Sequence, residues 1–137
     1  MGKALGIDYG TKRTGIAITD AMQINASGLT TVNTYQLDRF IEDILQKEAI
    51  ECFVIGDPKH LDGSTTDSTG HVNGFIKRLK KQYPDIPVHQ VDERFTSKIA
   101  KQSILASGVK KKGRQNKSLV DEVSATIILQ NFLDYKF

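Results

Sequence analysis

The sequence predicts a single α/β domain built on a mixed β-sheet, and three observations lead to this expectation. The chain has 137 residues, the ordinary size of one compact domain and too short for two. Its apolar residues follow strand patterns three times in succession near the start, after which strand and helix patterns alternate. No repeat or interdomain linker interrupts this order, so we expect one domain over residues 1–137.

The first third of the chain predicts three strands that follow one another as a meander. Residues 4–9 and 15–20 are apolar runs on either side of a turn rich in glycine and basic residues, which is typical of a hairpin. Residues 28–35, with their threonines and valine, predict the third strand. Apolar residues then recur at helical spacing over 36–48, which predicts an amphipathic helix.

The later elements alternate between strand and helix. Residues 52–55 are wholly apolar, as expected of a strand buried on both faces. The helix after them has its apolar inner face at Val72, Phe75, Ile76 and Leu79. A strand over 87–92, a helix from Thr96 to about residue 106 and a final helix from Ser118 complete the order. Parallel strands need crossover connections, and these helices supply them.

The composition excludes several classes of protein. No stretch reaches the ~20 apolar residues of a membrane-spanning helix, and the first residues show no signal-peptide pattern, so we expect a cytoplasmic protein without membrane contact. The single cysteine, Cys52, lies in an apolar run and cannot form an internal disulfide. The histidines and this cysteine lack the spacing of a zinc site, so any bound metal should have oxygen ligands.

The net charge of +3 is unevenly distributed along the chain. Residues 1–93 carry ten basic and thirteen acidic side chains. Residues 94–120 carry no acidic residue and eight basic ones, which are Arg94, Lys98, Lys101, Lys110, Lys111, Lys112, Arg114 and Lys117. A positive stretch of this kind indicates a polyanionic partner such as nucleic acid, although a solvated helix face and loop is the alternative interpretation.

Carboxylates recur at the ends of the predicted elements, at Asp8, at Asp92 and Glu93, and at Asp121. If these elements meet at one rim of the sheet, the carboxylates form a cluster. Two carboxylates about 4 Å apart repel by roughly 4 kcal/mol at an effective dielectric constant near 20, so a cluster persists only when it is protonated or binds cations. Oxygen ligands suit Mg²⁺ or Mn²⁺, and a pair of such ions promotes phosphoryl displacement.

Each of these acidic residues also has a purely structural interpretation. Asp8 could accept hydrogen bonds from backbone groups of the following turn, and Asp92 and Glu93 could be ordinary charges at the end of a strand. The segment from Ser118 to Asp121 resembles a capping box, in which Asp121 would stabilise the start of the final helix. The sequence leaves these alternatives open.

Four motifs in the same order resemble the YqgF/RuvX family, RNase H-like bacterial proteins named for Holliday junction resolution and regarded as nucleases that mature the 5′ end of 16S ribosomal RNA. The resemblance covers nearly the whole chain. It rests on GIDYGTKR at 6–13 with GIA at 15–17, Gly56-x-Pro58 followed by DGS at 62–64, DERFT at 92–96, and Asp121 with IILQ at 127–130.

The resemblance implies an RNase H-like five-stranded sheet of order 3-2-1-4-5 and a nuclease that uses two Mg²⁺ or Mn²⁺ ions. It implies that Asp8, Glu93 and Asp121 are the catalytic metal ligands. Residues expected to bind the substrate are Thr11, Lys12, Arg13 and Arg94, together with Lys110, Lys111, Lys112 and Arg114 of the basic loop. Asp57 and His60 depart from the family pattern, which puts substrate contacts of the loop 57–66 in doubt.

The function expected from this resemblance is 5′-end maturation of the 16S ribosomal RNA precursor, with the ribosomal small subunit as a partner. Resolution of four-way DNA junctions is one alternative and would need a homodimer, whereas RNA trimming needs only a monomer. A non-catalytic RNA-binding module is another. The DYGT turn also resembles the phosphate loop of actin-like ATPases, but the chain has one such domain where those enzymes have two, and it has no Walker sequence.

Overall fold

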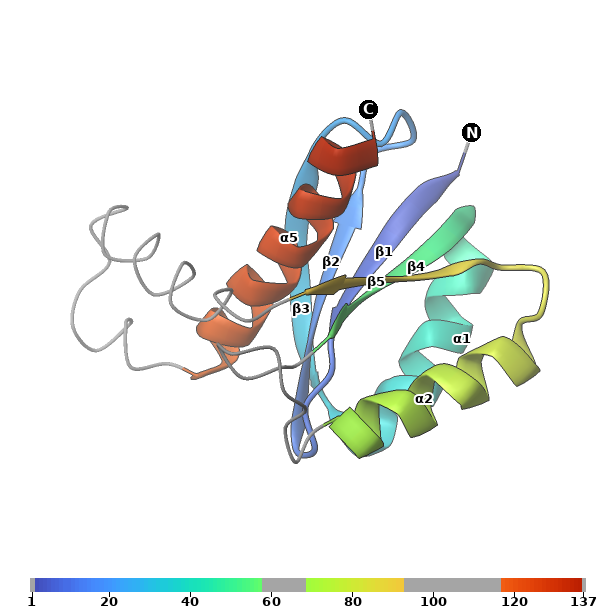
Figure 1. Cartoon of the computed structure of the whole chain (residues 1–137), viewed down its shortest axis with the longest axis vertical. Coiled ribbons are helices and arrows are strands. Elements are labelled where there is room, and N and C mark those ends of the chain that lie inside the picture. Colours follow the sequence, from blue (N-terminus) through green and yellow to red (C-terminus); the bar gives the residue numbers. More distant parts are fainter. Residues whose placement is uncertain (1, 58–68, 93–116, 137) are drawn as a thin grey trace.

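A five-stranded mixed sheet forms the centre of the structure, a computed structural model that describes residues 2–57, 69–92 and 117–136 (Figure 1). The strands are β1 (Lys3–Asp8), β2 (Arg13–Thr19), β3 (Ala26–Asn33), β4 (Ile50–Asp57) and β5 (Val88–Asp92). The helices are the 3₁₀ turn η1 (Thr34–Gln36), α1 (Leu37–Lys47), α2 (Thr69–Gln82) and α5 (Lys117–Lys136).

The strands lie in the order β3-β2-β1-β4-β5, which confirms the order 3-2-1-4-5. β2 is antiparallel to both β1 and β3, so these three strands form the expected meander. β4 is parallel to β1 and to β5. The carboxyl ends of β1, β4 and β5 therefore lie along one edge of the sheet.

Helices cover both faces of the sheet, with α1 and α2 on one face and α5 on the other (Figure 1). The alternation of side chains along β1 matches these two layers. Leu5 and Ile7 belong to the apolar core beneath α1 and α2, whereas Ala4 packs in a second core with Ala125 of α5. β4 divides in the same way, because Phe53 and Ile55 join the first core and Cys52 and Val54 the second. Cys52 is buried, as predicted.

The backbone of α5 lies unusually close to β1 because β1 has a glycine at the contact. A Cβ atom at Gly6 would lie 2.8 Å from Cβ of Leu129 and 3.2 Å from the backbone oxygen of Ala125. Carbon atoms in contact normally stay about 3.5–4.0 Å apart, so a larger residue would push the helix outward. Gly6 thus fixes the height of α5 above the central strand.

The boundaries of several predicted elements differ from those in the structure, among them the strand predicted over 28–35, which is β3 over Ala26–Asn33. The strand predicted over 52–55 runs from Ile50 to Asp57, because pairing with both β1 and β5 extends it beyond its apolar centre. The helix predicted over 36–48 begins as the 3₁₀ turn η1 and continues as α1. The helix predicted from Thr96 lies outside the described residues. Within the described part of the chain, no helix is both long and apolar enough to cross a membrane.

Candidate active site at the carboxyl edge of the sheet

Three parallel strands end in an aspartate at the same edge of the sheet. Their last residues are Asp8 in β1, Asp57 in β4 and Asp92 in β5, and the Cα positions of Asp57 and Asp92 are partners in the β4–β5 register. Ligand sites of open α/β sheets form outside the carboxyl ends of their strands. We therefore expect the active site at this edge of the sheet.

Asp8 lies at the last position of β1, where its Cα is paired with that of Gly15. It is half-buried, since the strand interior ends at Ile7. Strand alternation puts position 8 on the α5 side of the sheet, together with Ala4 and Gly6. The carboxylate that the sequence places inside an apolar run is thus at the rim of the sheet and not in its core.

The start of α5 lies at the same edge as Asp8. Ala26 of β3 donates its backbone N–H to the side chain of Gln130, whereas the side chain of Glu122 lies beside Gly28, two residues further along the strand. The helix therefore runs antiparallel to β3 and β1, and its first turns lie beyond Gly6 in the direction of Asp8. Position 121 is four residues before Ala125 and eight before Leu129, the two α5 residues that contact β1 at Gly6.

The capping-box interpretation of Asp121 does not match the observed start of α5. That interpretation requires Ser118 to stand before the helix, but the helix begins at Lys117. Ser118 is then inside the first turn, and no acidic residue occupies that turn. The backbone of Asp121 falls in the second turn of α5.

Hydrogen bonds from Thr34 hold the turn that joins β1 to β2. The backbone N–H of Thr34 donates to the carbonyl oxygen of Lys12 at 3.0 Å, and its hydroxyl donates to the carbonyl oxygen of Gly10 at 2.6 Å. The hydroxyls of Thr14 and Thr34 are 3.0 Å apart. Because a hydroxyl has one hydrogen and that of Thr34 is already used, the fully buried Thr14 must be the donor in this contact.

The same turn is anchored to α2 on the other face of the sheet. The ring of Tyr9 stacks on that of Phe75 with centroids 4.8 Å apart and an interplanar angle of 20°. A Cβ atom at Gly10 would collide with the backbone oxygen of Arg13, so the turn requires glycine at this position. Sequence reasoning missed Thr14, Thr34 and the ring pair, because these contacts join segments that no local pattern connects.

The basic residues predicted in this turn lie next to Asp8. Thr11 and Lys12 are exposed, and Arg13 is the partly buried first residue of β2. The turn that Thr34 holds therefore carries the hydroxyl of Thr11 and the positive charges of Lys12 and Arg13, and it directly follows the strand that ends at Asp8. Phosphate groups are bound by this combination of cationic and hydroxyl donors.

The remaining predicted site residues lie outside the described residues. They are Glu93, Arg94, Lys110, Lys111, Lys112 and Arg114, and the loop residue His60 is also among those not described. Among the described residues, no group of three or more histidine, cysteine, aspartate or glutamate side chains could hold a metal ion. The structure places Asp8 and the backbone of Asp121 at one edge, and the third carboxylate stays a prediction.

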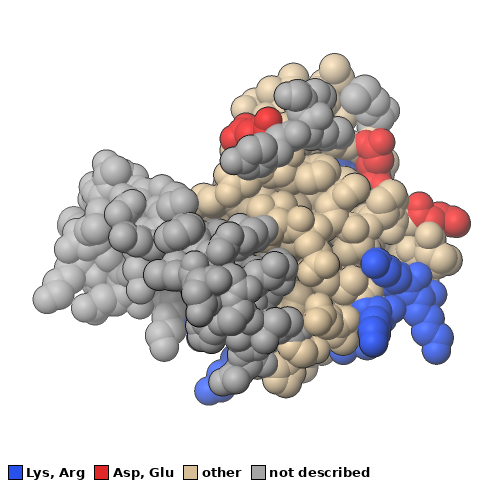
Figure 2. Space-filling model, in the orientation of Figure 1, with Lys and Arg blue, Asp and Glu red and all other residues tan. Residues whose placement is uncertain are grey.

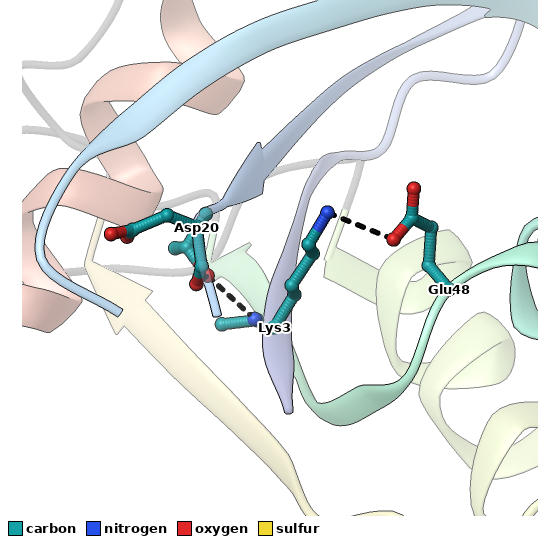
Figure 3. A network of polar contacts seen from close by, with 5 residues as sticks. Lys3, Asp20 and Glu48 are labelled. Carbon is teal, nitrogen blue, oxygen red and sulfur yellow. Dashed lines mark hydrogen bonds and ion pairs between the residues drawn. The ribbon is translucent and has the colours of Figure 1, made fainter. Parts of the chain in front are cut away.

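The opposite edge of the sheet shows carboxylates with structural roles (Figure 3). Nζ of Lys3 forms an ion pair with Oε2 of Glu48 at 2.8 Å. Oδ1 of Asp20 accepts the backbone N–H groups of Ile24 at 2.8 Å and Asn25 at 3.2 Å. These hydrogen bonds hold the pKa of Asp20 below its ordinary value. Asp20 therefore organises the β2–β3 loop, the kind of role that the structural interpretation would assign to Asp8.

The sheet order and the acidic residue at the end of the central strand define an RNase H-like domain. A solved structure of Thermus thermophilus RuvC in complex with a Holliday junction substrate has a TM-score of 0.60 at 14% identity, with 99% of this chain and 96% of that chain covered. Fowlpox virus resolvase, solved with Holliday junction DNA, has a TM-score of 0.58 at 12% identity, with 98% and 99% covered. At these identities the likeness shows the fold.

The chain belongs to the RuvX family, described as Holliday junction resolvase, which it matches over residues 2–135. A relative from Flavobacterium johnsoniae is 53% identical over 136 residues, with 99% of both chains covered. One from Porphyromonas gingivalis is 47% identical over 134 residues, with 98% of this chain and 97% of the relative covered. Both carry the name "Putative pre-16S rRNA nuclease". The family makes this chain a nuclease, an enzyme that hydrolyses phosphodiester bonds.

Proposed function

We propose that this nuclease cleaves the precursor of 16S ribosomal RNA near its 5′ end in the cytoplasm and that it depends on divalent metal ions. The observation that carries the proposal is the position of Asp8, a half-buried carboxylate between a held basic turn and the first turns of α5. The RNA substrate is supported by the relatives that are named for it and that match over nearly their whole length.

We assign metal binding to Asp8, Glu93 and Asp121. Their oxygen donors fit Mg²⁺ or Mn²⁺, and two ions would suffice for phosphodiester hydrolysis. Position 121 shares the helical stripe of Ala125, which faces β1. In the sequence Glu93 directly follows Asp92, the last residue of β5, and β5 ends at the same edge of the sheet as β1.

The chain's own residues bind and orient the substrate in this proposal. Thr11, Lys12 and Arg13 bind the phosphates that flank the cleaved bond, and Arg94 orients the reacting phosphate. Lys110, Lys111, Lys112 and Arg114 hold the more distant backbone. Metal ions held by Asp8, Glu93 and Asp121 would supply an activated water and would stabilise the charge that develops on the phosphate oxygens. The bond between phosphorus and the 3′ oxygen breaks, which leaves a 5′-phosphate and a 3′-hydroxyl.

The test is cleavage of an end-labelled single-stranded RNA that contains the 5′ end of the 16S precursor. Wild type, Asp8→Asn and Asp20→Asn are compared with Mg²⁺, with Mn²⁺ and with EDTA. We expect metal-dependent cleavage by wild type and by Asp20→Asn, because Asp20 lies at the opposite edge of the sheet. Asp8→Asn should be inactive. Cleavage by Asp8→Asn at the wild-type rate would contradict the proposed site.

Thermal unfolding of the same proteins tests metal binding without an activity assay. Metal ions that bind only the folded state raise its unfolding temperature. Mg²⁺ or Mn²⁺ should therefore stabilise wild type and Asp20→Asn more than Asp8→Asn. Without metal, Asp8→Asn should be as stable as wild type or more stable, since it removes repulsion among carboxylates. A clear loss of metal-free stability would favour the structural interpretation of Asp8.

Resolution of four-way DNA junctions is the second candidate, because the family description names it. Symmetrical cleavage of a junction needs two active sites and hence a homodimer, whereas trimming an RNA end by a monomer, with the ribosomal small subunit as partner, needs one. A four-way DNA junction and the RNA, assayed at equal concentration, separate the candidates. Faster cleavage of the junction, with a dimer in solution, would replace the RNA proposal.

A further inference from the structure

The exposed face of α2 carries a concentration of positive charge outside the proposed site. The helix contains four basic residues and no acidic one. They are Lys77, Arg78, Lys80 and Lys81, and all four are exposed. Figure 2 shows lysine and arginine side chains gathered over this part of the molecule. The net charge of this region does not reveal the positive face of α2, because residues 1–93 carry more acidic than basic side chains.

Most of this charge has no partner among the described residues. Arg78 lies 3.6 Å from the carboxylate of Asp38, and its guanidinium carbon is 5.6 Å from the ring centroid of Phe75. Lys77, Lys80 and Lys81 form no ion pair within the part of the chain that the structure describes. Three ammonium groups on one helix therefore face solvent.

The residues opposite the buried side of α2 form a distinct stripe, which we call the α2 stripe. It consists of Gly70, Gly74, Lys77 and Lys81, all exposed and spaced by four, three and four residues. This spacing places them on one face of a helix. The opposite face is the buried one, with Val72, Phe75, Ile76 and Leu79. At 1.5 Å per residue the stripe is about 17 Å long.

The two glycines of the stripe lie beside open space. Within the part of the chain that the structure describes, a Cβ atom at Gly70 or at Gly74 would meet no other atom within 4 Å. Glycine weakens a helix interior relative to nearly every other residue, so position 74 does not favour glycine for folding. Glycine does allow another backbone to approach a helix closely. Bare helix backbone followed by two lysines is a surface suited to a sugar–phosphate chain.

The stripe begins near the proposed site. α2 connects the parallel strands β4 and β5, so it starts at the edge of the sheet where Asp8 lies and runs toward the opposite edge. The stacked rings of Tyr9 and Phe75 join α2 to the turn that follows Asp8. Because Phe75 lies on the face of α2 opposite the stripe, a polyanion held at the turn reaches the stripe by passing around the start of the helix near Gly70.

We propose that the α2 stripe binds the sugar–phosphate backbone of the substrate on one side of the cleaved bond. Lys77 and Lys81 contact phosphates, and Gly70 and Gly74 let the backbone lie against the helix. This inference rests on the proposed nuclease function and adds to it a contact surface that lies outside the residues assigned to cleavage.

Salt dependence of RNA binding tests the charged half of the stripe. Binding of fluorescein-labelled single-stranded RNA is measured by anisotropy between 50 and 200 mM salt, with Asp8→Asn as the parent to prevent cleavage. Each phosphate contact on single strands contributes about 0.7 to the slope of log affinity against log salt. Over this range the parent should lose about sevenfold more affinity than the same protein with Lys77→Gln and Lys81→Gln, which lacks two contacts.

The matched control removes two exposed charges from α1, with Arg39→Gln and Lys47→Gln in the same parent. Its salt slope should equal that of the parent. If the α2 variant keeps the slope of the parent, or if the α1 control lowers the slope as much, the proposal is wrong. With either result, RNA binding by the parent would still agree with the proposed nuclease function. If the parent binds neither RNA nor four-way DNA, both proposals fail.

Gly70→Gln with Gly74→Gln tests the uncharged half of the stripe. Glutamine favours a helix more than glycine does, and the space at both positions is open, so this variant should unfold at a higher temperature than the parent. The same side chains should obstruct the approaching backbone and weaken RNA binding at least threefold. A gain in stability together with a loss of binding excludes damage to the fold as the cause. Unchanged affinity would overturn the role of the glycines.

Discussion

The hydroxyl of Thr34 holds the turn beside Asp8, and its removal gives a quantitative prediction. Thr34→Val keeps the shape of the side chain but removes the hydrogen bond to the Gly10 carbonyl and the acceptor used by Thr14. A hydrogen bond contributes about 1 kcal/mol net, and a buried polar group left without a partner costs about 1–3 kcal/mol. Because the Thr14 side chain is fully buried, Thr34→Val should destabilise the fold by about 3 kcal/mol.

The second half of this prediction concerns Thr14. Thr14→Val removes one hydrogen bond and leaves no buried donor unpaired, so it should cost about 1 kcal/mol. In the double variant both hydroxyls are gone, and the cost should be about 2 kcal/mol. The addition of Thr14→Val to Thr34→Val should therefore stabilise the protein by about 1 kcal/mol.

Urea unfolding of wild type, the two single variants and the double variant measures these free energies, with Thr34→Ser as the control that keeps the hydroxyl. Thr34→Val should also reduce kcat/KM for RNA cleavage, whereas Thr34→Ser should restore most of it. A double variant that is less stable than Thr34→Val would refute this prediction, because the two hydroxyls would then act independently. Equal stability of Thr34→Val and Thr34→Ser would also refute it.

Three further predictions concern single positions elsewhere in the fold. Gly6→Ala should destabilise the protein by about 1–3 kcal/mol in urea and lower kcat, because its methyl group would push α5 and position 121 away from β1. Gly74→Ala should raise stability by about 1 kcal/mol in the same assay, since the added methyl group enters open space. The pKa of Asp20 is lower in the folded protein than in the unfolded chain, so its contribution to stability is present above the unfolded pKa and is lost as the pH falls through the folded pKa. The difference in thermal midpoint between wild type and Asp20→Ala should accordingly be constant above about pH 5 and shrink at more acidic pH; a difference that grows on acidification would contradict the assignment.

The sequence predicted the order and type of the described elements because their apolar patterns are local. The alternation along β1 and β4 and the helical spacing in α2 follow directly from burial on particular faces. The ends of elements were less predictable. β4 extends past its apolar centre because its neighbours offer backbone partners, and α5 starts before Ser118 although Ser118 resembles a capping residue.

The candidate site was predictable as a set of residue types but not as an arrangement. Asp8 stood out as a charge inside an apolar run, and the structure places it, half-buried, at the last position of that strand. The hydroxyls of Thr14 and Thr34 join two segments that are separated in the sequence. The periodicity of apolar residues therefore does not predict their contact. The α2 stripe was overlooked for another reason, because its lysines occur in a region whose overall charge is negative.

The contact between α5 and β1 joins the last helix of the chain to its first strand. During synthesis the ribosome makes β1 well before α5, so position 121 can reach the end of β1 only after the intervening strands and helices have been made. Until then Ala4, Cys52 and Val54 lack the helix that covers them. Such long-range contacts also form late and slowly in folding. The metal site that we propose can therefore assemble only after α5 has been made and has packed on β1.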